Sequence, residues 1–260
     1  MRSLQFLAVT MCLLTTACIA LAYPTLAGYT GTGVLPTALV PPAGQWDVAA
    51  DFYNTENSGA TGLLETSANS YPIRTVYGVS KNFEVGAGYA FSEVGEDDAN
   101  TWNVNAKYQF AENFGFPWSI GARFAQTDLS ASDTTVNTFN AYLVGSRIFP
   151  RKDPAQPLII GSFGLNWTTQ DADDTNDAFR VFGSASATFC NGLELAADVQ
   201  AQSDDFDSDP LYSLVARYPL SNTTTMQVGF TNANPTFVSS QSEGNFFAGL
   251  NLSFDGAYEK

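Results

Sequence analysis

The chain has 260 residues, a formal net charge of −15 and no histidine, and only 14% of its residues are charged. Globular domains usually carry about 25% charged residues, so the sequence combines a low density of charge with strong acidity. The acidity argues against nucleic acid as a partner, because the phosphate backbone is bound by lysine and arginine. The length suits one large all-β domain as well as two smaller domains.

The first 22 residues have the pattern of an export signal. An arginine stands near the start, the apolar run LQFLAVTMCLL follows, and the small residues at 20–22 form a cleavage site. We expect cleavage after Ala22, which makes Tyr23 the first mature residue of an exported protein. An alternative interpretation is a lipoprotein signal in which Cys18 carries lipid. A transmembrane anchor is disfavoured, because about 20 consecutive apolar residues are needed to span a bilayer.

Residues 23–44 differ from the rest of the mature chain. They are rich in glycine and proline and contain no charged residue. The segment shows no alternation of apolar and polar residues, and Pro36, Pro41 and Pro42 cannot donate the hydrogen bonds of a strand ladder. The sequence therefore predicts that this segment adds no lipid-facing strand.

From residue 45 onward, apolar and polar residues alternate with a period of two, which indicates β-strands. In TWNVNAKYQF, at 101–110, Trp, Val, Ala, Tyr and Phe occupy every second position, with polar residues between them. We predict twelve strands, with ten or fourteen as alternatives. Their expected ranges are 45–54, 71–79, 83–92, 101–110, 118–126, 136–149, 158–168, 178–189, 193–202, 211–220, 223–230 and 245–254.

The connections between these segments are expected to alternate in length. Five are short: 80–82, 111–117, 150–157, 190–192 and 221–222. Six are longer: 55–70, 93–100, 127–135, 169–177, 203–210 and 231–243. An even number of strands, with short turns at one end and long loops at the other, is typical of an outer-membrane barrel.

The apolar face is expected to contact lipid. Aromatic residues stand near the strand ends, as Trp102 and Phe110 do, which fits girdles at two membrane interfaces. The sheet must close, because lipid cannot satisfy the backbone groups of an open edge. The alternative, a soluble β-sandwich, would bury its apolar faces and would not need to sort its loops by length.

The sequence therefore predicts an all-β fold, a closed antiparallel transmembrane β-barrel with short periplasmic turns and longer acidic extracellular loops. The expected organisation is a signal peptide at 1–22, a segment at the periplasmic mouth at 23–44, the barrel at 45–254 and a short periplasmic tail at 255–260. The expected location is the cell outer membrane. The expected partners are outer-membrane lipid and lipopolysaccharide, the barrel-insertion machinery, and small ions or solutes.

Charged residues fall in two groups. Five bases and five acids are expected on the inward face of the barrel: Asp47, Asp51, Arg74, Glu84, Lys107, Arg123, Arg180, Glu194, Asp198 and Arg217. Equal numbers suit a salt-bridged lining, and charged rings that select ions are the other interpretation. Both stay open at this point.

Most of the 26 acidic residues lie in the six predicted long loops, which contain no lysine or arginine. They include Asp171, Asp173, Asp174, Asp177, Asp204, Asp205, Asp207 and Asp209. Exposed acids keep loops soluble, and they also attract cations. The run DADDTND at 171–177 has clustered carboxylates, but it lacks the glycine and the terminal glutamate of an EF-hand loop. We expect no metal site and no cofactor.

Two resemblances add to this interpretation. Residues 45–254 resemble the porin-like barrels of Gram-negative outer membranes. Residues 30–38, TGTGVLPTA, resemble a TG-x-x-PTA-like opening of some exported barrel proteins, including ones linked to exopolysaccharide. Barrels of this kind often end in an aromatic residue that the insertion machinery reads. Here Phe254 closes the last predicted strand, but DGAYEK follows it.

The absence of histidine disfavours several enzymes. Outer-membrane phospholipases, omptin-like proteases and lipid A deacylases rely on a histidine for proton transfer. Zinc sites are also disfavoured. Two functions remain. The first is a small, weakly cation-selective channel for ions or small solutes. The second is a non-conducting structural or surface-interaction barrel, linked to envelope or exopolysaccharide assembly.

Overall fold

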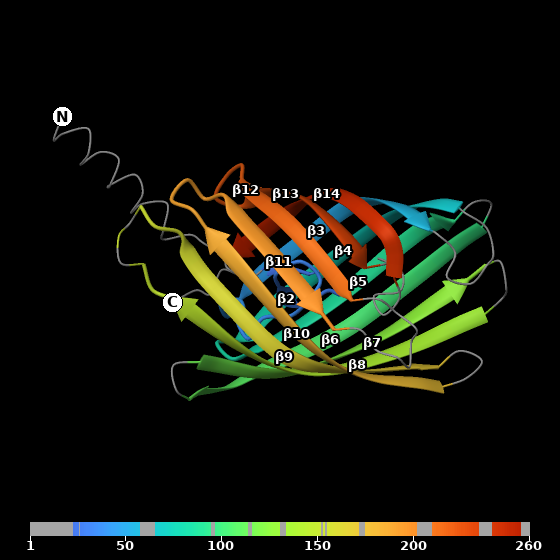
Figure 1. The fold of residues 1–260 in the computed structure, drawn as a ribbon, viewed down its shortest axis with the longest axis horizontal. Helices are drawn as coiled ribbons and strands as arrows, with labels where there is room; N and C mark the ends of the chain where they lie inside the picture. Colours follow the sequence, from blue (N-terminus) through green and yellow to red (C-terminus); the bar gives the residue numbers. More distant parts are fainter. Residues whose placement is uncertain are drawn as a thin grey trace.

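The structure, a computed structural model, contains a closed antiparallel barrel (Figure 1). It describes residues 23–25, 27–57, 66–94, 97–113, 116–130, 134–151, 153, 155–171, 175–201, 210–233 and 241–255. The barrel strands are β3 (Gln45–Asn57), β4 (Thr66–Ser80), β5 (Phe83–Val94), β6 (Asp97–Asn113), β7 (Phe116–Leu129), β8 (Thr134–Phe149), β9 (Leu158–Asp171), β10 (Thr175–Thr188), β11 (Glu194–Gln200), β12 (Leu211–Pro219), β13 (Thr224–Ala233) and β14 (Gln241–Asp255). No helix in the described residues is long and apolar enough to cross a membrane.

Each strand pairs with the next along the chain, and β14 pairs with β3 to close the barrel. Phe254 lies opposite Trp46 in this closing pair. Because no edge is left open, every strand has a neighbour on both sides for its backbone hydrogen bonds. The predicted fold class and the count of twelve strands are confirmed.

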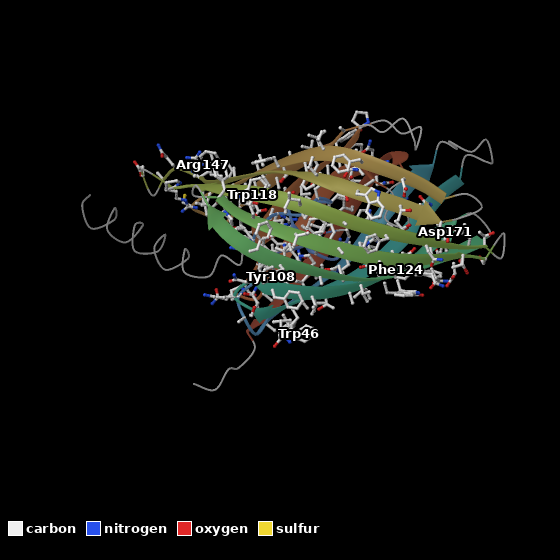
Figure 2. The ribbon with its side chains drawn as sticks, turned by 90° about the horizontal axis from the view of Figure 1, so that it is seen from below. Trp46, Tyr108, Trp118, Phe124, Arg147 and Asp171 are labelled. Carbon is white, nitrogen blue, oxygen red and sulfur yellow. The ribbon has the colours of Figure 1, made fainter. Side chains whose placement is uncertain are left out.

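The outer surface of the barrel is apolar, as the alternation predicts. Large apolar side chains point outward and are exposed, among them Ile73, Val181 and Phe246. In Figure 2, Trp118 and Arg147 lie toward one end of the barrel, while Phe124 and Asp171 lie toward the other. The aromatic residues thus approach both ends of the apolar band, as interface girdles do.

The strands are longer than the alternation suggests, which corrects the predicted loops. The connections 95–96, 130–133 and 172–174 are as short as several turns at the opposite end. The two ends of the barrel therefore differ less in loop length than the sequence predicts. Val94 pairs with Asp97 in the ladder between β5 and β6. The hydrogen bonds between strands use backbone groups alone. The strands can therefore continue beyond the apolar band, where outward residues no longer have to be apolar.

The same correction applies to the acidic residues of the predicted loop at 169–177. Asp171 is the last residue of β9 and Asp177 lies within β10, both with exposed side chains. The other predicted loop acids, Asp173, Asp174, Asp204, Asp205, Asp207 and Asp209, lie outside the described residues. The signal peptide predicted at 1–22 also lies outside them. Of the tail predicted at 255–260, Asp255 is instead the last residue of β14, and residues 256–260 lie outside the described residues.

The chain before β3 enters the barrel. Strands β1 (Tyr23–Pro24) and β2 (Thr30–Gly31) pair with each other, and Figure 1 shows β2 inside the barrel wall. Residues 27–38, here called the luminal segment, contact inward side chains of β5, β6, β7, β8, β11 and β12. After it, the chain leaves along β4, where the Gly44 N–H donates to the Gly78 carbonyl at 2.7 Å, and then begins β3.

Candidate functional site within the barrel

The luminal segment folds into two consecutive turns, together called the knob below. In the first turn, the Gly28 N–H donates to the carbonyl oxygen of Thr25 at 2.9 Å, and Gly28 has a φ of 88° that favours glycine. In the second, the Thr32 N–H donates to the Leu35 carbonyl at 3.1 Å. These turns expose several backbone N–H and C=O groups, which need partners because the segment is buried.

Asp198 of β11 satisfies the backbone of the second turn. One oxygen of its carboxylate accepts hydrogen bonds from the N–H groups of Gly33 at 2.9 Å, Val34 at 2.9 Å and Leu35 at 3.2 Å. The same oxygen accepts from the Thr32 hydroxyl at 3.0 Å. A buried carboxylate is costly without such donors, so the turn and Asp198 stabilise each other.

Glu84 and Lys107 hold the opposite side of the knob. They form an ion pair at 3.1 Å on neighbouring strands. Glu84 accepts hydrogen bonds from the Thr30 N–H at 3.0 Å and the Thr30 hydroxyl at 2.7 Å. The Lys107 ammonium donates to the carbonyl oxygens of Thr30 and Thr37, each at 3.1 Å. Both luminal charges therefore bind the segment as well as each other.

Two further ion pairs lie on the inward face. Arg217 contacts Glu194 at 2.7 Å and donates a hydrogen bond to the Thr32 carbonyl oxygen. Arg74 pairs with Asp51. The structure thus joins six of the ten predicted luminal charges in three acid–base pairs, and two of the three pairs also hold the luminal segment.

The remaining four luminal charges have different surroundings. Asp198 holds the second turn of the segment, and Asp47 accepts hydrogen bonds from the Gln45 side chain at 2.9 Å. Arg123 donates to Asn140 at 3.3 Å, and Arg180 lies three strand pairings away along the wall, on β10. All ten predicted side chains point inward and are buried.

Serine residues complete the attachment at the end of the knob. The Ala38 N–H donates to the Ser146 hydroxyl at 2.8 Å, and the Ser119 hydroxyl donates to the Ala38 carbonyl at 2.7 Å. Sequence reasoning did not single out Ser119 or Ser146. An inward serine on a polar strand face carries no signal that distinguishes it from its neighbours.

Inward aromatic residues were also missed. Tyr53 and Phe247 pack with Val34 of the segment, and Tyr142 and Phe182 pack with Leu35. For Tyr142 the pairing of strands gives a signal, because this residue lies opposite Gly121. A Cβ at that glycine would overlap the tyrosine ring. An inward glycine on one strand thus makes room for a large ring on the next.

A narrow hollow remains between the segment and the wall formed by β7 to β12. It has room for about one water molecule. Its lining includes Arg123, Arg180 and the amides of Asn140 and Asn166, facing Leu35 of the segment. Among the described residues, no group of three His, Cys, Asp or Glu side chains is placed to hold a metal ion.

Solved structures with the same fold come from outer-membrane barrels. The KdgM porin matches with a TM-score of 0.51 and 16% identity, over 79% of this chain and 99% of that one. The NanC porin matches with a TM-score of 0.52 and 11% identity, over 80% of this chain and 98% of that one. The fold is that of an outer-membrane β-barrel. No family model and no curated protein matches the sequence.

The same fold also carries an enzyme. The outer membrane phospholipase A from Escherichia coli matches with a TM-score of 0.50 and 9% identity, over 82% of this chain and 94% of that one. Identities this low establish the architecture alone, so the function of this chain has to be argued from its own residues. The resemblance of residues 30–38 to exopolysaccharide-linked barrel proteins stays a prediction.

Proposed function

We propose that the chain forms a small outer-membrane channel for ions or small solutes, which the luminal segment narrows from within. The observation that carries this proposal is the chemistry of the attachment. The segment is held largely by hydrogen bonds to luminal charges, such as Asp198 and Lys107. Water can replace such bonds when the segment moves, which leaves a polar, charged passage behind it.

The size of the barrel supports the same proposal. Side chains fill barrels of about eight strands, whereas about 16–18 strands leave an open aqueous channel. Twelve strands enclose more space than inward side chains fill, and here part of that space is occupied by residues 27–38 of the same chain. Two barrels with this fold, KdgM and NanC, are porins by name.

The proposed orientation follows the usual barrel arrangement, with the acidic loops outside and the opposite turns in the periplasm. Residues 23–44 then enter from the periplasmic mouth, and the tail that follows β14, at 256–260, lies in the periplasm. The outer surface contacts outer-membrane lipid and lipopolysaccharide, after assembly by the barrel-insertion machinery.

Selectivity is proposed to be weak and for cations. The five luminal bases and five luminal acids balance, and three pairs of them are in direct contact. The net field at the entrance then comes from the acidic residues at the ends of the strands and in the loops beyond them, such as Asp171 and Asp177. Carboxylates at a mouth concentrate cations there.

Planar-bilayer recordings of the full chain and of a variant lacking residues 27–41 test this proposal. We expect small conductance steps from the full chain and steps several-fold larger from the variant, because the deletion empties the lumen. Heat-modifiable migration in a gel shows whether the variant still forms a barrel. Equal conductance of the two proteins would contradict narrowing by the segment.

The second candidate function is a non-conducting structural or surface-interaction barrel. Residues 27–38 fill part of the lumen, and this observation favours a structural barrel if the segment stays in place permanently. The same recordings separate the two functions. If the barrel is structural, the full chain shows no conductance steps at any applied voltage. The partners would then be sought in envelope or exopolysaccharide assembly.

A further inference from the structure

Arg123 is a buried charge without a carboxylate partner. Its side chain is 3% exposed, and none of the ion pairs formed by the described residues includes it. Its one hydrogen bond goes to the neutral amide of Asn140 at 3.3 Å, and its Nε atom has no hydrogen-bond acceptor. A buried guanidinium is costly unless a negative charge compensates it.

The amide N–H groups around the hollow are used within the wall, so its unpartnered donors are guanidinium nitrogens. The side-chain oxygen of Asn140 accepts the hydrogen bond from Arg123, and its amide N–H donates to the Thr168 hydroxyl at 2.6 Å. Asn166 donates in the same way to Gln200 at 3.1 Å. Arg180 adds a second guanidinium on the same lining. The described lining of the hollow therefore contains two guanidinium groups and no carboxylate, and Arg123 is the one on which the argument rests.

The segment side of the hollow supplies no counter-charge. It is formed by Val34, Leu35 and the ring of Tyr29. Burial raises the pKa of the Tyr29 hydroxyl well above its usual range, so that this group stays neutral beside Arg123. Asp198, which contacts the same turn, already accepts its backbone N–H groups.

We propose that this hollow binds a small monovalent anion, of the size of chloride, as the counter-ion of Arg123. The room for about one water molecule excludes a carboxylate while the segment is in place and limits the ligand to a single monatomic ion. Guanidinium groups form charge-assisted hydrogen bonds with anions, which makes Arg123 the main donor and Arg180 the second.

The bound anion has a consequence for the wall around it. It cancels the charge of Arg123 locally, on the stretch of wall that lines the hollow. It also fixes the wall from β7 to β11 against the luminal segment. The site itself does not depend on conduction, because the cost of a buried arginine is the same in a channel and in a structural barrel.

Bromide is the probe for the test, because it replaces chloride and scatters anomalously. Crystals of the full chain grown with sodium bromide are expected to show an anomalous peak in the hollow, within hydrogen-bonding distance of the Arg123 guanidinium. Arg123→Gln should abolish the peak. Arg147→Gln is the matched control: it removes an equal charge from an exposed outer position beside Phe149, and the peak should persist.

A solution measurement accompanies the crystals. An anion that binds the folded protein raises its unfolding midpoint. Replacing sodium chloride by sodium gluconate at constant ionic strength should therefore lower the midpoint of the parent protein and leave that of Arg123→Gln unchanged. A hollow without a bromide peak in the parent protein overturns the proposal even if Arg123→Gln does not fold. Conductance without bromide binding would leave the channel in place and remove the anion site.

Discussion

The carboxylate of Asp198 on β11 accepts a hydrogen bond from the backbone N–H of Val34, at 2.9 Å and across 164 residues of sequence. This contact joins a charged position of the barrel wall to the uncharged segment that precedes the barrel. It shows what at least one luminal charge does in this structure: it holds a piece of the chain inside the lumen. The first prediction follows from it.

Asp198→Asn should loosen the luminal segment. The amide keeps one acceptor oxygen but loses the charge, and hydrogen bonds to charged groups contribute about 1.5–3 kcal/mol each. We expect the free energy of unfolding to fall by about 2 kcal/mol or more, and the single-channel conductance to rise toward that of the deletion variant. Asp128→Asn, at an exposed position of β7, is the charge-matched control. Unchanged stability and conductance in Asp198→Asn would contradict the anchoring role.

Gly86→Val tests the close approach between the wall and the first turn. A Cβ on Gly86 would overlap the carbonyl oxygen of Gly28, so a valine there has to push the segment away. We expect the barrel to remain heat-modifiable and the conductance to increase. In Gly183→Val, the control, a Cβ meets its nearest atom at 3.7 Å, and we expect no change in conductance. An increase in both variants would point to a general effect of losing glycine.

Ala197→Arg tests which face of the wall meets lipid. Ala197 points outward near the middle of β11, and an arginine at the bilayer midplane costs about 2–4 kcal/mol in such barrels. Thr138→Arg, on the inward face of β8, should cost much less because the guanidinium can reach luminal water. Asn105 is unsuitable as the inward position, since it packs against Gly28 of the segment. Unfolding titrations with urea compare the two variants, and equal costs would be inconsistent with the assigned faces.

Changing Asp171, Asp173, Asp174 and Asp177 together to Asn tests the origin of selectivity. Exposed charges act over about 8–10 Å at physiological ionic strength and about 3 Å at 1 M salt. We expect weak cation selectivity at low salt that nearly disappears at 1 M. The quadruple variant should shift the reversal potential toward zero without altering folding. Anion selectivity in the parent protein would show that the luminal arginines, rather than the rim, set the field.

The mature chain should begin at Tyr23, because the small residues at 20–22 suit signal cleavage. Intact mass and terminal sequencing of the exported protein measure this directly. In the structure the ring of Tyr23 lies under the Arg217 guanidinium, 4.7 Å from it, so the expected new terminus lies inside the barrel. A lipid-modified Cys18 at the terminus would instead identify a lipoprotein.

Much of the barrel follows from the sequence alone. Alternation with a period of two fixes which residues point outward, because lipid on one side and a polar lumen on the other impose opposite requirements on successive positions. That rule placed Asp198 and Arg123 inside and Phe246 outside. It could not give the ends of β5 and β6, since above the apolar band both faces of a strand meet water and the pattern disappears while the ladder continues.

The position of the luminal segment was decided by tertiary structure. Nothing in the local pattern of residues 27–38 points to Asp198 or Lys107, because the segment offers backbone N–H and C=O groups that every sequence has. Its partners are side chains brought together only when β14 pairs with β3 and the barrel closes. The sequence by itself determined which charges face the lumen. Closure decided which of them bind each other, which bind the segment, and that Arg123 is left facing a hollow without an acid.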